Sequence, residues 1–234
     1  MILKKFVKRI IPQKYHSKLF YFIRGYSTQS FSQEGEDLLL KRIFENKLEK
    51  GYYVDVGAHH PKRFSNTFLF YKNGWTGINI DAMPGSMKLF NIVRPRDINI
   101  EIPISERKEI LIYYAFNESA LNTFNRELGE YRIFEKQNSL LFKKEIETET
   151  LEKILDQFLP INQKIDFLTI DVEGLDLAVL KSNNWLKYKP EVILVEAYES
   201  KLSGVLNSDI YLFLGKLGYD IVAKTPNTVF YKLI

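Results

Sequence analysis

Two pairs of residues in the sequence could do acid–base chemistry. His59 and His60 follow the strand-forming run YYVDVGA at 52–58, and Asp171 and Glu173 lie in IDVEG at 170–174. Histidine titrates near neutral pH and can take a proton from a hydroxyl, and two carboxylates at a strand end can act as general bases. We therefore expect His59 or His60 to orient or deprotonate a substrate, with Asp171 or Glu173 setting the polarity of the site. A purely structural role for the histidines is the alternative.

The turn after the first predicted strand has the features of a nucleoside site. Asp55 and Gly57 end that strand, and the next predicted strand, TGINIDA at 76–82, ends in Asp81. Glycine permits the positive φ of a tight turn, and an acidic side chain after the second strand can accept both hydroxyls of a ribose. This order predicts a nucleoside cofactor. The alternative is that Gly57 only turns the chain and Asp81 caps the next helix.

The glycine pattern narrows the choice of cofactor. A dinucleotide needs G-x-G-x-x-G, so that the helix can approach the pyrophosphate, but His59 and Lys62 stand at the second and third glycine positions. Their side chains lie where a pyrophosphate needs bare backbone. The pattern argues against NAD or FAD and favours a cofactor with an adenosine but no pyrophosphate, such as S-adenosylmethionine.

Further charged residues could contact the substrate or a metal. Glu196 ends the fifth predicted strand, and Lys62 and Arg63 could bind an anionic part of an acceptor; a salt bridge and a solvated loop are the simpler alternatives. Asp171 and Glu173 could hold Mg²⁺ or Mn²⁺. A metal is not favoured, because too few further oxygen ligands can be identified.

These residues need a scaffold of alternating strands and helices. The strands are predicted at 52–58, 76–82, 98–105, 165–174 and 190–198, with helices at 32–51, 65–75, 176–186 and 208–218, and a closing hairpin at 219–234. Ser32 is a plausible N-cap of the first helix, and Gly51 should end it. Strands separated by helices predict a mostly parallel sheet with right-handed crossovers and an antiparallel strand from the hairpin. Residues 32–234 then form one α/β domain, with an insertion at about 108–163 that shapes the acceptor site or only caps the periphery.

The composition of the chain limits the chemistry and the partners that can be expected. The chain has 234 residues, a net charge of +4 and no cysteine, which excludes disulfides and thiolate chemistry. Residues 1–31 are set apart, because 1–12 are basic and amphipathic. They are expected to pack on protein or to contact the inner face of a membrane peripherally, in a cytoplasmic protein. The basic residues form no aromatic-interleaved stripe, so nucleic acid is not expected as a partner.

Three blocks of sequence resemble the FkbM family of S-adenosylmethionine-dependent methyltransferases: SQEGED, YVDVGAHHPKRFSNTFLFYKNGWTGINIDA, and IDFLTIDVEGLDLAVLKS followed by PEVILVEAY. The resemblance covers about 32–198; the family often has a lysine where Thr169 stands. It implies a Rossmann-like class I methyltransferase fold with a seven-stranded sheet, the last strand antiparallel. It also implies O-methylation of a hydroxyl on a sugar, a glycan precursor or a secondary metabolite. A nicotinamide-dependent oxidoreductase and a non-catalytic adenosine-cofactor-binding protein of a membrane-associated assembly are the alternatives.

The resemblance also implies which residues hold the cofactor. Asp55, Gly57 and Ala58 would line its methionine and ribose end, and Asp81 would bind the ribose hydroxyls. Ala82 and Met83 would flank the adenine, with Ser105 at the adenine edge. Asp171 would face the sulfonium. Gln33 and Glu36 would close over the methionine portion, unless 32–36 is no more than a helix cap.

Overall fold

The structure, a computed structural model, describes residues 12, 27–47, 50–135, 138–197, 199 and 201–234. Contacts divide the chain into a unit 1–30 and a unit Phe31–Ile234, and the second is described below by itself. The amphipathic segment 1–12 lies outside the described residues except for residue 12, so its contact with protein or membrane stays a prediction. None of the described helices is long and apolar enough to span a membrane.

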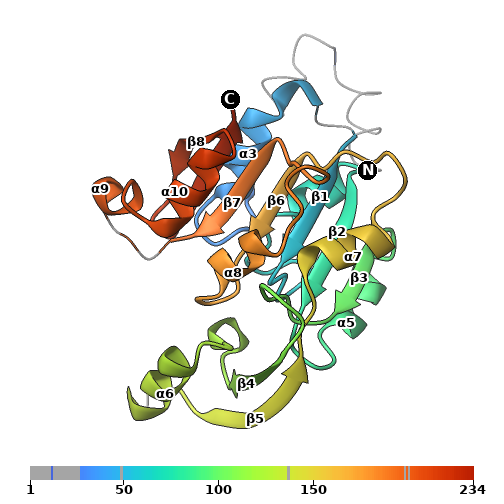
Figure 1. The fold of residues 1–234 in the computed structure, drawn as a ribbon. Helices are drawn as coiled ribbons and strands as arrows, with labels where there is room; N and C mark the ends of the chain where they lie inside the picture. Colours follow the sequence, from blue (N-terminus) through green and yellow to red (C-terminus); the bar gives the residue numbers. More distant parts are fainter. Residues whose placement is uncertain (1–11, 13–26, 48–49, 136–137, 198, 200) are drawn as a thin grey trace. The chain divides into compact units, whose positions relative to one another are not determined.

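A seven-stranded sheet forms the centre of the second unit (Figure 1). Its strands are β1 (Tyr52–Val56), β2 (Thr76–Asp81), β3 (Ile98–Glu101), β6 (Phe167–Ile170), β7 (Val192–Glu196), β8 (Tyr219–Lys224) and β9 (Thr228–Leu233), in the order β3-β2-β1-β6-β7-β9-β8. All pairs are parallel except those of β9, which runs antiparallel to β7 and β8. This confirms the predicted fold: a mostly parallel seven-stranded sheet closed by an antiparallel strand.

Helices cover both faces of this sheet. They are α3 (Glu36–Ile43), α4 (Phe68–Lys72), α5 (Met87–Val93), α7 (Leu151–Phe158), α8 (Asp176–Lys181), α9 (Leu202–Val205) and α10 (Asp209–Lys216), with a 3-10 turn η1 (Glu45–Lys47). On one face, Val54 and Val56 pack with α7, α8 and α10. On the other, Tyr53 packs with α3 and α4. Side chains alternate along β1, so Asp55 lies on the same face as Tyr53.

A smaller two-stranded sheet stands apart from the larger one (Figure 1). It consists of β4 (Ile110–Phe116) and β5 (Leu140–Glu147), and between them lie the 3-10 turn η2 (Ser119–Leu121) and helix α6 (Arg126–Glu135). Both strands lie within the stretch predicted as an insertion at about 108–163, and so does the start of α7, where the Thr150 side chain accepts a hydrogen bond from the Lys153 N–H. The sequence pattern did not identify α5, η2, α6 or α9.

Several predicted elements are shorter in the structure, and two of them show why. The helix predicted at 32–51 runs only over Glu36–Ile43, because Gly35 (φ 90°) is its N-cap and the residues after Phe44, Glu45–Lys47, are exposed and bury no apolar face. Ser32 still contributes, since its Oγ accepts the Asp37 N–H at 3.3 Å. The strand predicted at 98–105 ends at Glu101, two residues before Pro103, which has no N–H to donate to a ladder.

Candidate active site

A cavity of about 300 Å³ lies at the carboxyl ends of the parallel strands. Ten of the residues predicted to act line it: Gln33, Gly57, His59, Arg63, Asp81, Ala82, Met83, Asp171, Glu173 and Glu196. The chain leaves β1 for β2 and β3 on one side and returns to β6 and β7 on the other, so strand order reverses between β1 and β6. Ligands of open α/β sheets bind at such a reversal, outside the carboxyl ends of the strands.

Gly57 allows the loops after β1 and β6 to touch. Its φ is 86°, a conformation that L side chains rarely adopt, and a Cβ added there would collide with the carbonyl oxygen of Asp171. The Asp171 N–H in turn donates to the Val56 carbonyl at 2.9 Å. The close backbone approach expected at Gly57 is therefore made, in this structure, to the neighbouring loop.

Asp81, at the end of β2, is held by two backbone donors. Its Oδ2 accepts the His59 N–H and its Oδ1 accepts the Met83 N–H, both at 2.8 Å. Burial raises the pKa of Asp81, and these two hydrogen bonds oppose that rise. A carboxylate oxygen can accept more than one hydrogen bond, so both oxygens retain capacity for the hydroxyls of a ribose.

His59 reaches the cavity from the β1 loop. It adopts a left-handed φ of 51°, and its Nε2 lies 2.9 Å from Ser119 Oγ. Its Nδ1 is buried and has no hydrogen-bond partner within the described part of the chain. Burial lowers the pKa of His59, and the positive charge of Arg63 lowers it further, so the imidazole is neutral at pH 7 and can accept a proton.

His60 has a different position. It is not among the residues that line the cavity. Its Nδ1 accepts the N–H groups of Lys62 at 3.0 Å and Arg63 at 2.9 Å, which shapes the loop that carries His59. The two histidines are thus divided between the cavity and the turn beside it.

Three carboxylates meet on the β6–β7 side of the cavity. Asp171, Glu173 and Glu196 each bring one oxygen within 4.8 Å of the others. Burial raises the pKa of Asp171 well above its usual range, and the charge of Glu196 raises it further. Carboxylate oxygens suit Mg²⁺ or Mn²⁺, but three are fewer than the six ligands of an octahedral site. Glu173 is also bound by Arg132 at 2.6 Å, so the set fits a metal only in part.

The loop that carries Glu173 is shaped by residues that the sequence patterns did not single out. Glu173 has a left-handed φ of 54°, which costs free energy in a residue other than glycine. The buried Asp176 carboxylate accepts the N–H groups of Val172 and Gly174, both at 3.3 Å, and Thr123 Oγ1 donates to the Glu173 carbonyl at 2.8 Å. These contacts hold the Glu173 side chain on the cavity wall.

The stretch between β3 and β6 supplies the opposite wall. Its lining residues are Tyr113, Glu118, Ser119, Ala120, Leu121, Asn122 and Phe124. Arg63, from the β1 loop, donates hydrogen bonds from both terminal nitrogens to the Glu118 carboxylate, at 3.2 and 3.3 Å. No spacing in the sequence identified these residues individually, because their relation to the cavity depends on how β4 and η2 fold back.

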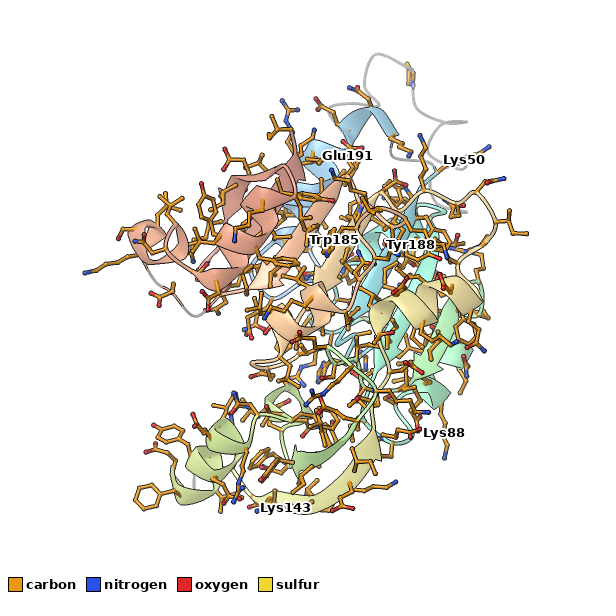
Figure 2. The ribbon with its side chains drawn as sticks, in the orientation of Figure 1. Lys50, Lys88, Lys143, Trp185, Tyr188 and Glu191 are labelled. Atoms are coloured by element: carbon orange, nitrogen blue, oxygen red, sulfur yellow. The ribbon has the colours of Figure 1, made fainter. Side chains whose placement is uncertain are left out.

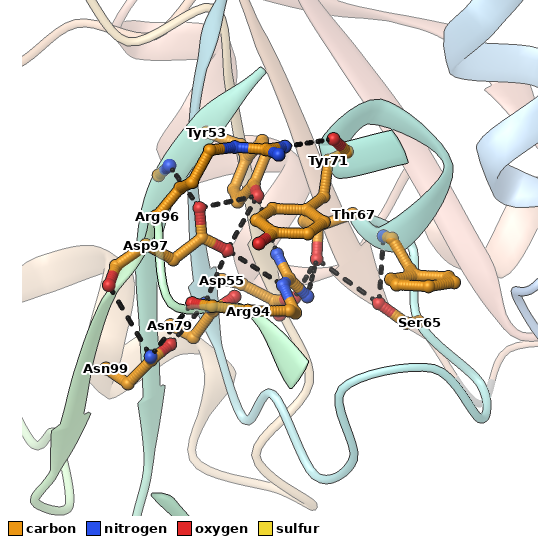
Figure 3. A network of polar contacts seen from close by, with 12 residues as sticks. Tyr53, Asp55, Ser65, Thr67, Tyr71, Asn79, Arg94, Arg96, Asp97 and Asn99 are labelled. Carbon is orange, nitrogen blue, oxygen red and sulfur yellow. Dashed lines mark hydrogen bonds and ion pairs between the residues drawn. The ribbon is translucent and has the colours of Figure 1, made fainter. Parts of the chain in front are cut away.

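The carboxyl of Asp55 does not line the cavity. It accepts a 2.7 Å hydrogen bond from Thr67 Oγ1, which in turn accepts one from the buried Arg94 at 2.9 Å (Figure 3). Arg94 also binds Asp97 at 2.7 Å and the Tyr53 hydroxyl at 2.7 Å. Burial raises the pKa of Asp55 to about 6, against the lowering effect of Arg94. Asp55 therefore belongs to a core network beneath the cavity.

The other predicted cofactor residues also lie off the main cavity. Ala58 is buried against Met87 and Phe90, and Ser105 Oγ donates to Glu109 at 3.3 Å. Ile102, Pro103 and Ile104 line the cavity where Ser105 was expected. Glu36 lines a smaller cavity of about 40 Å³ that shares Gln33, Asp171 and Glu196 with the larger one. Its buried carboxylate accepts the Glu34 N–H at 2.9 Å and the Thr225 hydroxyl at 3.2 Å.

The sheet order and the cavity at its reversal define the class of protein, a Rossmann-like α/β protein with a ligand site at the carboxyl ends of its strands. A family model described as the methyltransferase FkbM domain matches residues 55–221. The chain therefore belongs to the FkbM methyltransferase family, whose cofactor is S-adenosylmethionine. No curated protein matches the sequence.

The chain is also similar, at low identity, to solved structures. A proposed RNA methyltransferase from Pyrococcus horikoshii is 10% identical with a TM-score of 0.45, over 95% of this chain and 100% of that one. An O-methyltransferase from Bacillus cereus, solved in complex with SAH, is 7% identical with a TM-score of 0.41, over 100% and 98%. A proposed O-methyltransferase from Klebsiella pneumoniae is 8% identical with a TM-score of 0.43, over 98% and 94%. Similarity at this level carries no information about the substrate.

Proposed function

We propose that the protein transfers the methyl group of S-adenosylmethionine to a hydroxyl of a sugar, a glycan precursor or a secondary metabolite. The observation that carries the proposal is the joint opening of Asp81, Asp171 and His59 into one cavity at the strand-order reversal. These residues supply an acceptor for the ribose hydroxyls, a carboxyl group that would face the sulfonium and a neutral base. All three are positioned by loops at the carboxyl ends of strands.

The lining of the cavity supports this assignment of the cofactor. Asp81 would accept the ribose hydroxyls, Ala82 and Met83 would lie along the adenine with Ile102–Ile104, and Asp171 would face the sulfonium. The lining carries five carboxylates, Asp81, Glu118, Asp171, Glu173 and Glu196, against the single cation Arg63. Such a wall attracts a positively charged sulfonium and repels the pyrophosphate of a dinucleotide.

The residues around the cavity then account for the reaction. S-adenosylmethionine supplies an activated methyl group, so that an O–C bond forms as the C–S bond breaks. The chain must align the acceptor oxygen with that carbon, which can contribute roughly 7–11 kcal/mol in favourable cases. His59 takes the hydroxyl proton at Nε2, directly or through the Ser119 hydroxyl 2.9 Å away.

The charge of the lining also favours one kind of acceptor. Arg63 is bound by Glu118, and Lys62 lies outside the lining, which leaves little positive charge for a phosphate. Carboxylates accept hydrogen bonds from hydroxyls. A neutral, hydroxyl-rich acceptor fits this surface better than the anionic acceptor suggested by Lys62 and Arg63 in the sequence.

The test uses S-adenosylmethionine labelled with ¹³C in the transferred methyl group. The protein is incubated with this cofactor and a pool of polar metabolites and glycans, and the products are read by NMR. The proposal predicts a new signal in the O-methyl region, weaker with Asp81→Ala when the cofactor is not saturating. A signal only in the N-methyl or C-methyl region would overturn the assignment to a hydroxyl. Adding EDTA, then Mg²⁺ or Mn²⁺, to the same reaction tests whether the three carboxylates need a metal.

A further inference from the structure

Strand β5 has an open edge. It pairs with β4 along one side, with Phe142 opposite Ala115 and Glu145 opposite Ile112. On its other side, no residue in the described part of the chain pairs with it. The two-stranded sheet stands away from the main sheet, so this edge is accessible (Figure 1). An edge strand presents unpaired N–H and C=O groups and is a template for another strand.

Apolar side chains gather around this edge. Leu141 and Phe142 of β5 are 59% and 37% exposed, and Ile110 and Ile112 of β4 are 65% and 43% exposed. On α6, Phe134 is 80% exposed. These side chains belong to three elements of one region, β4, β5 and α6. Large exposed apolar side chains gathered in one region are typical of an interaction surface, whereas singly scattered ones are not.

The sequence of β5 is complementary to itself when it runs antiparallel. With Lys144 on a two-fold axis, Lys143 lies opposite the partner's Glu145, and Phe142 lies opposite the partner's Ile146. Within residues 142–146 the register therefore forms two ion pairs and two apolar pairs, each of the kind that stabilises paired strands. Lys144 faces its own copy at the axis, where its exposed side chain can turn into water.

We propose that β5 is the dimerisation edge of this protein, joined antiparallel to β5 of a second copy. The two small sheets then become one four-stranded sheet, β4-β5-β5-β4, whose interface is the same surface on both subunits. Lys143 lies on β5 (Figure 2) and already forms a 2.8 Å hydrogen bond with Glu130 of its own chain. Any test of the cross-strand pair must therefore separate it from the Lys143–Glu130 bond.

The absence of cysteine from the 234-residue chain allows a direct test of the register. Lys144→Cys places two thiols opposite each other at the axis, within the distance that a disulfide can bridge. Mild oxidation should give a covalent dimer. Glu147→Cys, also on β5 and exposed, lies opposite the partner's Leu141 and should not cross-link. Equal cross-linking of both variants, or of neither, overturns the register.

Charge exchange tests the pairing in solution, with molecular mass measured by sedimentation over a range of concentrations. The wild type should be a dimer. Lys143→Glu or Glu145→Lys alone should raise the dimer Kd by about tenfold or more, since two ion pairs become two repulsive pairs. The double exchange, and an equal mixture of the two single variants, should restore the dimer. Glu130→Gln removes the negative charge that Lys143 meets within its own chain and should leave the dimer intact. A wild type that stays monomeric, or single variants that dimerise normally, would overturn the proposal.

Discussion

Arg132 of α6 and Glu173 of the β6–α8 loop form an ion pair with a nitrogen–oxygen distance of 2.6 Å, and their side chains are only 13% and 15% exposed. The pair links a helix of the inserted stretch to the wall of the cavity. A second contact supports it, because Thr123, from the same stretch, donates to the Glu173 carbonyl. This cavity-lining carboxylate is therefore positioned by residues about 40–50 positions away in the sequence.

Removing Arg132 should destabilise the fold measurably. Arg132→Ala leaves the Glu173 carboxylate without this partner, and we expect the free energy of unfolding to fall by about 1–3 kcal/mol. The matched control is Lys187→Ala, which breaks an exposed ion pair with Asp156 and should change stability far less. Urea denaturation measures both. Equal losses in the two variants would contradict a special role for the Arg132–Glu173 pair.

Gly57 should tolerate no side chain. Gly57→Ala forces a Cβ against the Asp171 carbonyl at a positive φ, so we expect a loss of several kcal/mol or failure to fold. Gly215→Ala, in α10, meets open space and should stabilise the protein by about 0.5–1 kcal/mol, since alanine is the better helix former. Thermal unfolding of both variants measures this contrast. A Gly57→Ala protein as stable as the wild type would show that the two loops do not pack as described.

Asp55 should make stability depend on pH. Burial raises its folded pKa to about 6, above the ordinary 3.8, so the native state binds the proton more tightly than the unfolded state does. Stability from this group is present below about pH 4 and is lost as the pH rises through about 6, by up to about 3 kcal/mol. Asp55→Asn should remove this component, which is visible as the difference between the two stability curves from pH 4 to 7. Parallel curves would contradict the buried position of the carboxyl.

His59 should control turnover and its pH dependence. The sequence alone predicted a group that titrates near the free imidazole value, roughly 6 to 7. Since burial lowers the pKa of His59, activity should rise with pH through a midpoint below 6.5 and be level at pH 7. His59→Ala should lower turnover by about 10²–10⁴-fold with cofactor affinity nearly unchanged. His60→Ala is the comparison, because His60 lies off the cavity, and it should reduce turnover far less. A larger loss of turnover in His60→Ala than in His59→Ala would assign the base to His60 instead.

The sequence predicted those parts of the site that depend only on residues adjacent in the sequence. Gly57 and Asp81 lie at the ends of two strands that can be recognised from their amino-acid types alone. Because the strands are parallel, these ends must lie at the same edge of the sheet. Asp55 was misplaced although its strand was correct, since alternation along β1 directs its side chain toward Thr67 and Arg94. Residues such as Arg132 leave no local pattern, because only the folded chain brings them to their partners.

Binding of S-adenosylmethionine to Asp81 tests the account most directly. Calorimetric titration of the cofactor into wild type, Asp81→Ala and Asp220→Ala compares a cavity carboxylate with an exposed one on β8. We expect one site in the wild type and Asp220→Ala. In Asp81→Ala, the loss of charged hydrogen bonds to the ribose should weaken binding by about 1–3 kcal/mol, or roughly 5- to 150-fold in Kd. Unchanged affinity in a folded Asp81→Ala protein would contradict the cofactor site.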